Sequence, residues 1–350
     1  MFVLQSEITI GKFRFSGVTE VRIKRDIHSI IEHAVMIMPS IARIEKHGQA
    51  LPEKIVTGSQ FAEGHEVVIK LGYGASLDDT KDNIKTEFRG FVKTRDLDVP
   101  LSVTCEGNSW LLRRNCITNF WKTISVKEYL EVAVNGLPDG RKFEVLCDTE
   151  AMLSNIEVNN KSGLEMINDL YKYSDGTLSC SFTSSGNLWC GFAYSGFMVG
   201  QELPDRQNEK TPKYKLGYNA LAGNDLRLRT AKEDAVVVKY NRRLPTGALI
   251  EGVSDVYNNA NRNCGRVMSH IADESTLRAM ANEKALRLSY TGYEGCFTGF
   301  LQPYIRAGAS IYIADSRSPE RAGNYLVEST EILFGSRGAR RILEVGPMSR

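Results

Sequence analysis

The feature that most constrains this chain is a residue-by-residue alternation of apolar and polar side chains in short runs. Phe13–Phe15 and Val21–Lys24 alternate in this way, and Ala34–Met38 is a more continuous apolar run. Successive side chains of a β-strand point to opposite faces of a sheet, so a period of two indicates strands. Further strand candidates, separated by glycine, proline and aspartate, are Glu66–Leu71, Phe88–Arg95 and Leu101–Cys105. Short strands with such turns between them predict a barrel or a sandwich.

The periodicity becomes helical at Ser125. Ser125–Glu128 and Ser162–Glu165 both have the spacing of a capping box, and each precedes apolar residues that share one helical face. Two β-rich runs follow the second helix, Thr177–Thr183 and Leu188–Tyr194, and the four residues between them suit an antiparallel hairpin. Residues 123–198 therefore predict a small α+β unit inserted into a β-rich chain.

The rest of the chain returns to strands after a segment without periodicity. Glu202–Pro212 contains two prolines and many polar residues, which is typical of a linker. Asn258–Asn263 is a polar loop, and Asp273–Leu288 predicts a third helix with acidic residues at the positive end of its dipole. The remaining strand candidates are Asp225–Thr230, Ala235–Tyr240, Ile311–Ile313, Tyr325–Ile332 and Arg341–Val345.

Length and charge limit the class of protein. A chain of 350 residues exceeds what one hydrophobic core organises, and at ~150 residues per domain it predicts two or three domains. The 44 Lys and Arg residues nearly balance 42 Asp and Glu residues, so the basic field that sequence-independent DNA binding needs is missing. The N-terminus has no signal-peptide pattern, and charged residues interrupt every apolar run before it could span a membrane. We expect a soluble protein that neither binds nucleic acid specifically nor enters a membrane.

The seven cysteines are odd in number and dispersed, and they include no C-x-x-C pair. This usage is typical of reduced thiols in a cytosolic protein. Cys180 and Cys190 could face each other across the predicted hairpin, so the sequence leaves open whether they ever pair.

A search for the residues of known catalytic and binding sites assigns none to this chain. It contains no phosphate-binding loop and no nucleophile elbow. His270, Asp273 and Glu274 are the nearest candidate zinc ligands, but they fit a solvated helix start better. The other four histidines, which are expected to be packed or surface residues in or beside strands, are His28, His33, His47 and His65. We therefore predict no catalytic residue, no cofactor and no metal.

Three other groups of residues have a plain structural interpretation. Carboxylates from remote positions could form an acid pair for glycoside hydrolysis, but Glu251 and Asp255 have the character of loop acids. The arginine pairs Arg113-Arg114, Arg242-Arg243 and Arg340-Arg341 are expected at strand ends, where charge keeps an edge soluble or pairs across subunits. The aromatic residues Phe120, Trp121, Trp189, Phe192 and Tyr194 are expected in a core or an interface.

The C-terminal stretch carries a resemblance to a known family. Its residues are Gly295–Gly299, Pro303, Gly308, Ile311–Ile313, Ser318–Val327 and Gly335–Gly346. This order of turns and strands resembles the end of phage baseplate hub proteins, the late control protein D group, which is similar to the tail hubs of phage Mu and T-even phages and to the hub half of VgrG spikes. Pro100–Glu106 resembles the closing strand of the family's first barrel, and residues 123–198 resemble its inserted domain.

The resemblance implies an α+β, mainly β fold with two antiparallel barrels like those of tail-tube subunits and an inserted α+β middle domain. The first barrel would be 1–120. The middle domain would combine 121–199 with 246–291, which brings the third helix beside the first two. The second barrel would combine 200–245 with 292–350.

The resemblance also implies a structural role without chemistry. The family works as a homotrimer, in which three chains with two barrels each present six similar units to a sixfold tail tube. The implied partners are the tail tube protein, a central spike, the tape measure and the baseplate wedge, in a virion or injection-system baseplate assembled in the bacterial cytoplasm. Since the sequence stops at Arg350 without a spike domain, we expect a separate spike protein. The near-neutral charge suits a channel through which DNA or tape-measure protein passes.

Two other functions stay open at this point. A β-rich enzyme acting on polysaccharide or peptidoglycan would show an acidic cleft with a perturbed carboxylate pair. A carbohydrate-binding tail adhesin would show an exposed aromatic platform, so Trp189 or Trp121 would face solvent.

Overall fold

The computed structural model describes residues 3–349 except 16, 47–48, 75–83, 138–139, 202–210, 222–224, 232–234, 258–261 and 317. Strands hold 51% of the chain and helices 18%, so the predicted mainly β, α+β fold with large antiparallel sheets is confirmed. Most of the linker expected at Glu202–Pro212, most of the loop at Asn258–Asn263 and His47 lie outside the described residues. No helix in the described part of the chain is long and apolar enough to cross a membrane.

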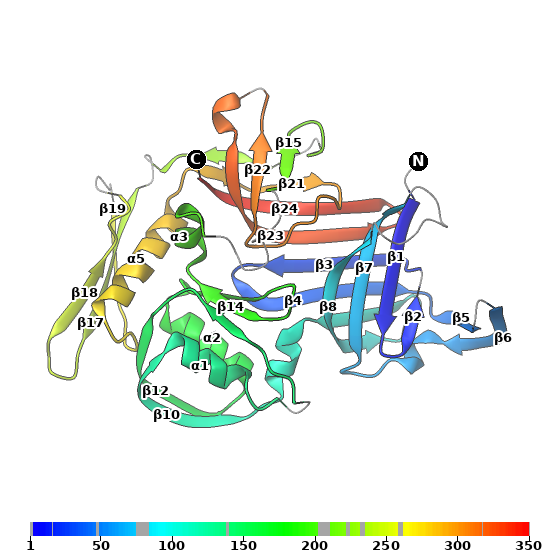
Figure 1. The fold of residues 1–350 in the computed structure, drawn as a ribbon, viewed down its shortest axis with the longest axis horizontal. Helices are drawn as coiled ribbons and strands as arrows, with labels where there is room; N and C mark the ends of the chain where they lie inside the picture. The colour runs from blue at the N-terminus through cyan, green and yellow to red at the C-terminus, as the bar shows by residue number, and fades with distance from the viewer. Residues whose placement is uncertain are drawn as a thin grey trace.

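The N-terminal part forms the first half of a large sheet. Its strands are β1 (Val3–Ile10), β2 (Phe13–Phe15), β3 (Glu20–Asp26), β4 (Ser29–Met38), β7 (Glu66–Gly74), β8 (Ile84–Asp96) and β9 (Leu101–Glu106). They pair in the order β3-β4-β9-β8-β7-β1-β2, with every pair antiparallel. In Figure 1, β1 and β7 run steeply across β3 and β4, so this half curls around an apolar core. Leu301, Ile332, Phe334 and Ala339 from the C-terminal part also contribute to this core. All six strand candidates from the first 105 residues lie within these strands, whereas β1 was not anticipated.

The C-terminal part forms the second half of the same sheet. Its strands are β15 (Lys213–Lys215), β16 (Arg227–Arg229), β20 (Gly292–Glu294), β21 (Cys296–Gly299), β22 (Ser310–Ala314), β23 (Gly323–Gly335) and β24 (Gly338–Ser349). β22 stands steeply against the long hairpin of β23 and β24, as β7 does against β3 and β4 (Figure 1), and a separate apolar core lies inside. β23 pairs antiparallel with β3, which joins the two halves into one 14-stranded sheet.

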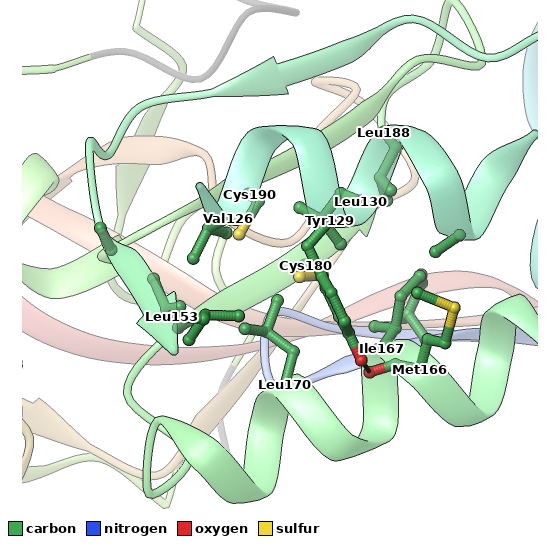
Figure 2. Close-up of a cluster of buried hydrophobic side chains, with 14 of the residues drawn as sticks. Val126, Tyr129, Leu130, Leu153, Met166, Ile167, Leu170, Cys180, Leu188 and Cys190 are labelled. Carbon is green, nitrogen blue, oxygen red and sulfur yellow. Dashed lines mark hydrogen bonds between the residues drawn. The ribbon is translucent and has the colours of Figure 1, made fainter. Parts of the chain in front are cut away.

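A third unit lies beside this sheet and contains the helices. These are α1 (Val126–Val134), α2 (Gly163–Tyr173), α3 (Ala193–Met198) and α5 (Glu274–Leu288). Its strands are β10 (Ile117–Ser125), β11 (Val145–Cys147), β12 (Met152–Lys161), β13 (Ser179–Phe182), β14 (Leu188–Gly191), β17 (Val236–Arg243), β18 (Leu249–Val253) and β19 (Arg262–Val267). One large core joins them except α3, whose buried side chains lie in a smaller cluster with Trp189 and Leu286. Figure 2 shows the part of the large core between α1, α2 and the β13–β14 hairpin.

The three helices predicted from sequence are confirmed, and so are their start signals. In both capping boxes the serine side chain accepts from the backbone N–H of the glutamate three residues on, and the glutamate accepts from the serine N–H. Asp273 caps α5 by accepting from the backbone N–H of Thr276 at 2.7 Å. The predicted hairpin is also present, with Cys180 directly opposite Cys190 and both as free thiols.

The place of Ala235–Tyr240 differs from the prediction. We expected it in the second barrel as part of 200–245, but β17 pairs with β18 and β19 in a separate three-stranded sheet. Val236, Val238 and Tyr240 are buried in the core of the helical unit, where α5 packs against this sheet. The reason is packing: α5 needs an apolar sheet face to cover, and the alternate residues of β17 supply it.

Two local predictions are also corrected. β10 begins at Ile117 and pairs with β12, so residues 117–120 belong with the helical unit and not with the first barrel. The strand predicted over Leu188–Tyr194 ends at Gly191, and α3 begins two residues later. Phe192 precedes α3 without a side-chain cap, so the sequence offers no start signal for this six-residue helix.

Candidate functional site

The feature of this fold that best suits a function is an open face on the four central strands β4, β3, β23 and β24. Their register places side chains in rows across all four strands. One row is Val35, Arg22, Leu333 and Arg340, and the next is His33, Lys24, Glu331 and Ile342. These side chains are exposed or half-buried. The residues of this open face are Val35, Ile37, His33, Glu20, Arg22, Lys24, Glu331, Leu333, Arg340, Ile342 and Glu344.

The open face carries charges of both signs in equal number. Its acidic residues are Glu20, Glu331 and Glu344, and its basic residues are Arg22, Lys24 and Arg340, so three minus three gives no net charge with His33 neutral. Arg22 and Glu331 form an ion pair across the β3–β23 junction. Such a face is hydrated, yet it exerts little net pull on a passing polyanion.

The opposite face of the same strands is buried and holds the two halves together. Val21, Phe334 and Ala339 form one buried row, and Ala34, Ile23, Ile332 and Arg341 form the next. β3 keeps the alternation seen in the sequence, since Val21 and Ile23 lie on the core side and Arg22 and Lys24 on the open side, whereas the other three strands also carry apolar residues on the open side.

Arg341 is the exception in this buried row, because it is fully buried within the sheet core. Its guanidinium donates to Glu87 Oε1 of β8 at 2.7 Å and to the backbone carbonyl of Ile305 at 2.8 Å, and two further bonds go to the carbonyl of Leu301. Glu87 belongs to the first half and the carbonyls to the second. The predicted role of Arg341 as a strand-end surface charge is therefore wrong, because the side chain is an internal clamp.

A second ionic clamp joins all three parts of the molecule. Glu32 of β4 lies between Arg25 of β3, at 3.1 Å, and Arg306, at 2.7 Å, and Arg306 also donates to the carbonyl of Phe182 in β13. Burial alone would raise the pKa of Glu32, but the charges of Arg25 and Arg306 hold that pKa below its ordinary value. The carboxylate is therefore ionised and structural.

A polar groove of about 520 Å³ opens next to this clamp, between β7 and β8 on one side and the β13–β14 turn on the other. Its charged lining consists of Glu32 and Glu66 against Arg89, Arg141, Lys142 and Arg306. Glu66 forms an ion pair with Arg141, and Glu32 is paired as described above. The groove is thus basic in balance, whereas the enzyme alternative predicts an acidic cleft with a perturbed carboxylate pair.

The histidine and acid candidates named in the sequence take structural places. The His270 ring packs against Tyr173 at an interplanar angle of 47°, with ring centroids 4.3 Å apart, while Asp273 caps α5. Burial and the charge of Arg287 lower the pKa of His28 to about 4, so His28 is neutral at pH 7. Among the described residues, no group of three or more His, Cys, Asp or Glu side chains could hold a metal ion. His33, Asp255 and Glu274 are exposed, and His65 lies at a surface turn. Glu251 is also exposed, but it lies in β18 and not in a loop as predicted.

The aromatic and arginine candidates divide between core and surface. Trp189 is 5% exposed, and Trp121 is half-buried against Tyr129, so the platform that the adhesin alternative predicts is not built from these two rings. Phe120 is 62% exposed, so it is not a core residue, and its place in an interface stays a prediction. Arg242 is buried like Arg341, whereas the partly exposed Arg113 pairs with the buried Glu106 of β9.

A second exposed feature, not anticipated from the sequence, is an arm that extends from the first half. It consists of β5 (Ile41–Lys46) and β6 (Gln49–Val56), which form a separate two-stranded sheet and project from the body in Figure 1. Exposed apolar side chains gather at its base, where Leu97 lies against Gly58 just after β6. We call this set the arm patch; its residues are Ile41, Val56, Leu97 and Val99, each at least 59% exposed. Such a patch in water favours burial against a partner.

Comparison with known proteins finds similarity in structure and none in sequence. No protein-family model matches the chain, and no curated protein matches it. A tail protein from Neisseria meningitidis MC58 superposes with a TM-score of 0.64 at 8% identity, over 98% of this chain and 96% of that one. The 43 kDa tail protein of prophage MuSo2 from Shewanella oneidensis gives a TM-score of 0.59 at 13% identity, over 98% of both chains.

A third solved structure comes from a secretion system. It is an E. coli protein described as a component of the type VI secretion system with structural similarity to the T4 bacteriophage tail proteins gp27 and gp5. It gives a TM-score of 0.57 at 9% identity, over 98% of this chain and 77% of that one. All three superpositions cover the two halves of the sheet and the helical unit together, so the likeness extends to the whole architecture.

Proposed function

We propose, from the premise that this chain has the fold of the phage tail hub proteins, that it is the structural hub of a baseplate in a contractile tail or injection system. In this role three copies join a sixfold tail tube to a threefold central spike. The open face would line the channel of the trimer.

The observation that carries the proposal is the pairing of two long hairpins side by side. β3–β4 and β23–β24 are joined through β3 and β23, and each hairpin turns its open face the same way. Two hairpins in each of three copies give six similar units, which matches a sixfold tube by geometry alone. The absence of net charge on the open face is what a channel for DNA or a tape-measure protein requires, since a basic bore would hold a polyanion.

The three parts of the chain have distinct roles in this proposal. The first half of the sheet, residues 3–116, and the second half, residues 211–231 with 291–349, act as the two tube-like units. The helical unit, residues 117–201 with 235–290, packs outside them. This division puts β17 and the start of β10 in the helical unit, and their strand pairing supports it.

We further propose that the arm patch makes the contact between copies. A two-stranded ribbon is marginally stable alone, so β5 and β6 gain most from lying on another chain. The other partners in this proposal are the tail tube protein, a central spike, the tape measure and wedge proteins. The site of action is the virion or injection-system baseplate, assembled in the bacterial cytoplasm, and no catalytic step is assigned.

Oligomeric state is the direct test. Size-exclusion chromatography with light scattering at high protein concentration should give a trimer, and electron microscopy down its axis should show a six-lobed ring. Val99→Asp, in the arm patch, should shift the equilibrium toward monomer. The matched control is Val267→Asp, a similarly exposed valine on β19 of the helical unit, which should leave the trimer intact. A monomer at all concentrations that degrades bacterial cell wall would overturn the hub and favour the enzyme alternative.

A further inference from the structure

Three cysteines far apart in the sequence form one row across the small sheet of the helical unit. Cys147 on β11 lies beside Cys190 on β14 in a parallel pair, and Cys190 lies opposite Cys180 on β13 in an antiparallel pair. Register partners in a sheet point to the same face, so all three thiols share one side. The surroundings are largely apolar: Figure 2 shows Cys180 and Cys190 among side chains of α1 and α2.

The antiparallel pair has the geometry that a disulfide needs. Thr183 N–H donates to the carbonyl of Asn187, which makes this pair a hydrogen-bonded one at the end of the hairpin. Hydrogen-bonded and non-hydrogen-bonded pairs alternate along an antiparallel ladder, so Cys180 and Cys190, three pairs further, form a non-hydrogen-bonded pair. The Cα atoms of such a pair are about 4.5 Å apart, inside the range of about 4.4–6.8 Å that disulfides span.

The three thiols differ in access. Cys180 and Cys190 are both 0% exposed, so a reagent in solution cannot reach them directly in the folded protein. Cys147 is half-buried at the outer strand of the row, between charges of both signs: the neighbouring Asp148 raises its pKa and Lys127 lowers it. A hydrogen bond from the Cys190 thiol also lowers the pKa of Cys147, whereas the pKa of Cys190 is raised by its hydrogen bonds to the other two thiols and by burial. The row therefore has one reactive end and one protected end.

We propose that Cys147, Cys190 and Cys180 form a thiol relay that accepts a disulfide from a low-molecular-weight disulfide at the surface and moves it to the buried pair. In the first step the Cys147 thiolate attacks one sulfur of the external disulfide. The external S–S bond breaks, one external thiolate leaves and takes up a proton, and Cys147 carries a mixed disulfide.

Two exchanges complete the transfer. The Cys190 thiolate attacks the Cys147 sulfur and releases the second external thiol, which leaves a Cys147–Cys190 disulfide. Cys180 then attacks the Cys190 sulfur, which restores the Cys147 thiol and forms the Cys180–Cys190 disulfide across the hairpin. In total two protein thiols are oxidised, and one external disulfide is reduced to two thiols. The relay is independent of the hub proposal, because it depends only on this sheet.

The test is reaction of the folded full-length chain with oxidised glutathione, followed by acid quenching, alkylation of remaining thiols and peptide mass spectrometry. We expect a Cys180–Cys190 or Cys147–Cys190 crosslink while Cys105, buried in the first half, stays alkylated. Crosslinks that form only after unfolding in urea would overturn the proposal. So would a row that stays fully reduced after the exposed Cys116 has become glutathionylated.

Two variants test the order of the steps. Cys190→Ser should trap glutathione on Cys147, because no neighbouring thiol remains to displace it. Cys147→Ser should slow formation of the Cys180–Cys190 crosslink by roughly tenfold or more, since the buried pair loses its accessible entry point. Cys116→Ser is the matched control and should leave the rate unchanged. An equal rate in Cys147→Ser and in the unaltered chain would overturn the relay.

Discussion

Arg341 shows how one residue can decide whether the two halves of the sheet stay joined. It stands in an otherwise apolar row and bonds to Glu87 in one half and to two carbonyls in the other. The sequence could not reveal this role, because Arg340 and Arg341 differ only in the face of β24 to which they point. The alternation of β24 places Arg341 inside, but its partner Glu87 is 254 positions away.

Replacement of Arg341 by methionine should destabilise the protein by about 3–5 kcal/mol, because Glu87 is left as a buried charge without its partner. Urea unfolding followed by circular dichroism measures the change. Arg22→Gln removes an ion pair on the open face of the same sheet and should cost less than about 1 kcal/mol. Similar losses in both variants would contradict the clamp.

Arg341→Met combined with Glu87→Leu tests whether the loss of stability comes from the unpaired charge of Glu87. The double variant should recover part of the loss, since no unpaired buried charge remains. The carbonyls of Leu301 and Ile305 still lack their donor, so the recovery should be incomplete.

Two buried carboxyls should respond to pH in opposite ways. The pKa of Glu32 is held low by Arg25 and Arg306 against the effect of burial, so its stabilising contribution is present above the ordinary value of 4.5 and is lost as pH falls. Burial raises the pKa of Glu328, and the nearby Glu344 adds to this effect, so ionised Glu328 destabilises the fold at neutral pH.

Glu32→Gln should therefore lower the melting temperature at pH 7, whereas Glu328→Gln should raise it, because the amide still accepts from Tyr194 but carries no charge. The Glu328→Gln difference should shrink as pH falls through the raised pKa of Glu328 toward 4.5, whereas the Glu32→Gln difference should shrink only below 4.5, as pH approaches the lowered pKa of Glu32. Thermal unfolding across this range measures the effect. Glu150→Gln, at an exposed position, is the control and should change little at any pH. A loss of stability in Glu328→Gln at pH 7 would refute the argument.

At the scale of elements, local signals decided what the sequence could predict. α1, α2 and α5 begin at side chains that cap them, and the sequence contains those caps at the right spacing. α3 begins after Phe192 without a cap and is only six residues long, so no periodicity or start signal exists for it. β17 was correctly predicted as a buried strand, but its neighbours depend on α5, which lies more than thirty positions later.

The two capping boxes should each contribute measurably to stability. Ser125→Ala and Ser162→Ala remove the side chain that accepts from the backbone N–H of Glu128 and Glu165. Each should cost about 1 kcal/mol in urea unfolding. Ser336→Ala, in the exposed β23–β24 turn, is the control and should stay within about 0.5 kcal/mol of the unaltered chain. No loss in either capping variant would show that tertiary packing alone holds these helices.

At the scale of the whole molecule, the class of fold was predictable and the joining of its halves was not. Alternation, turn residues and capping boxes indicate a mainly β chain with a helical unit, and all of these are local. The pairing of β3 with β23 brings Ile23 opposite Ile332, and nothing in either strand specifies that partner. The open face exists only because of this pairing. The sequence therefore predicts the strands of the candidate site but not the face that they form together.

The charge balance of the open face can be tested by reversing it. Glu20→Lys, Glu331→Lys and Glu344→Lys each replace a negative by a positive charge, so together they raise the net charge of the open face by six per chain. We expect the unaltered protein not to retain duplex DNA at physiological salt, whereas this variant should bind a short duplex at least about tenfold more tightly, with affinity falling as salt rises. Fluorescence anisotropy with a labelled duplex measures the difference.

The matched control carries the same change of charge elsewhere, as Glu63→Lys, Glu131→Lys and Glu150→Lys at exposed positions. If only total charge mattered, both variants would bind DNA equally, and the open face would have no special place. Stronger binding by the open-face variant is expected because three copies would bring their reversed faces around one channel, where the fields add on a single duplex. Tight binding of DNA by the unaltered protein would contradict a neutral channel.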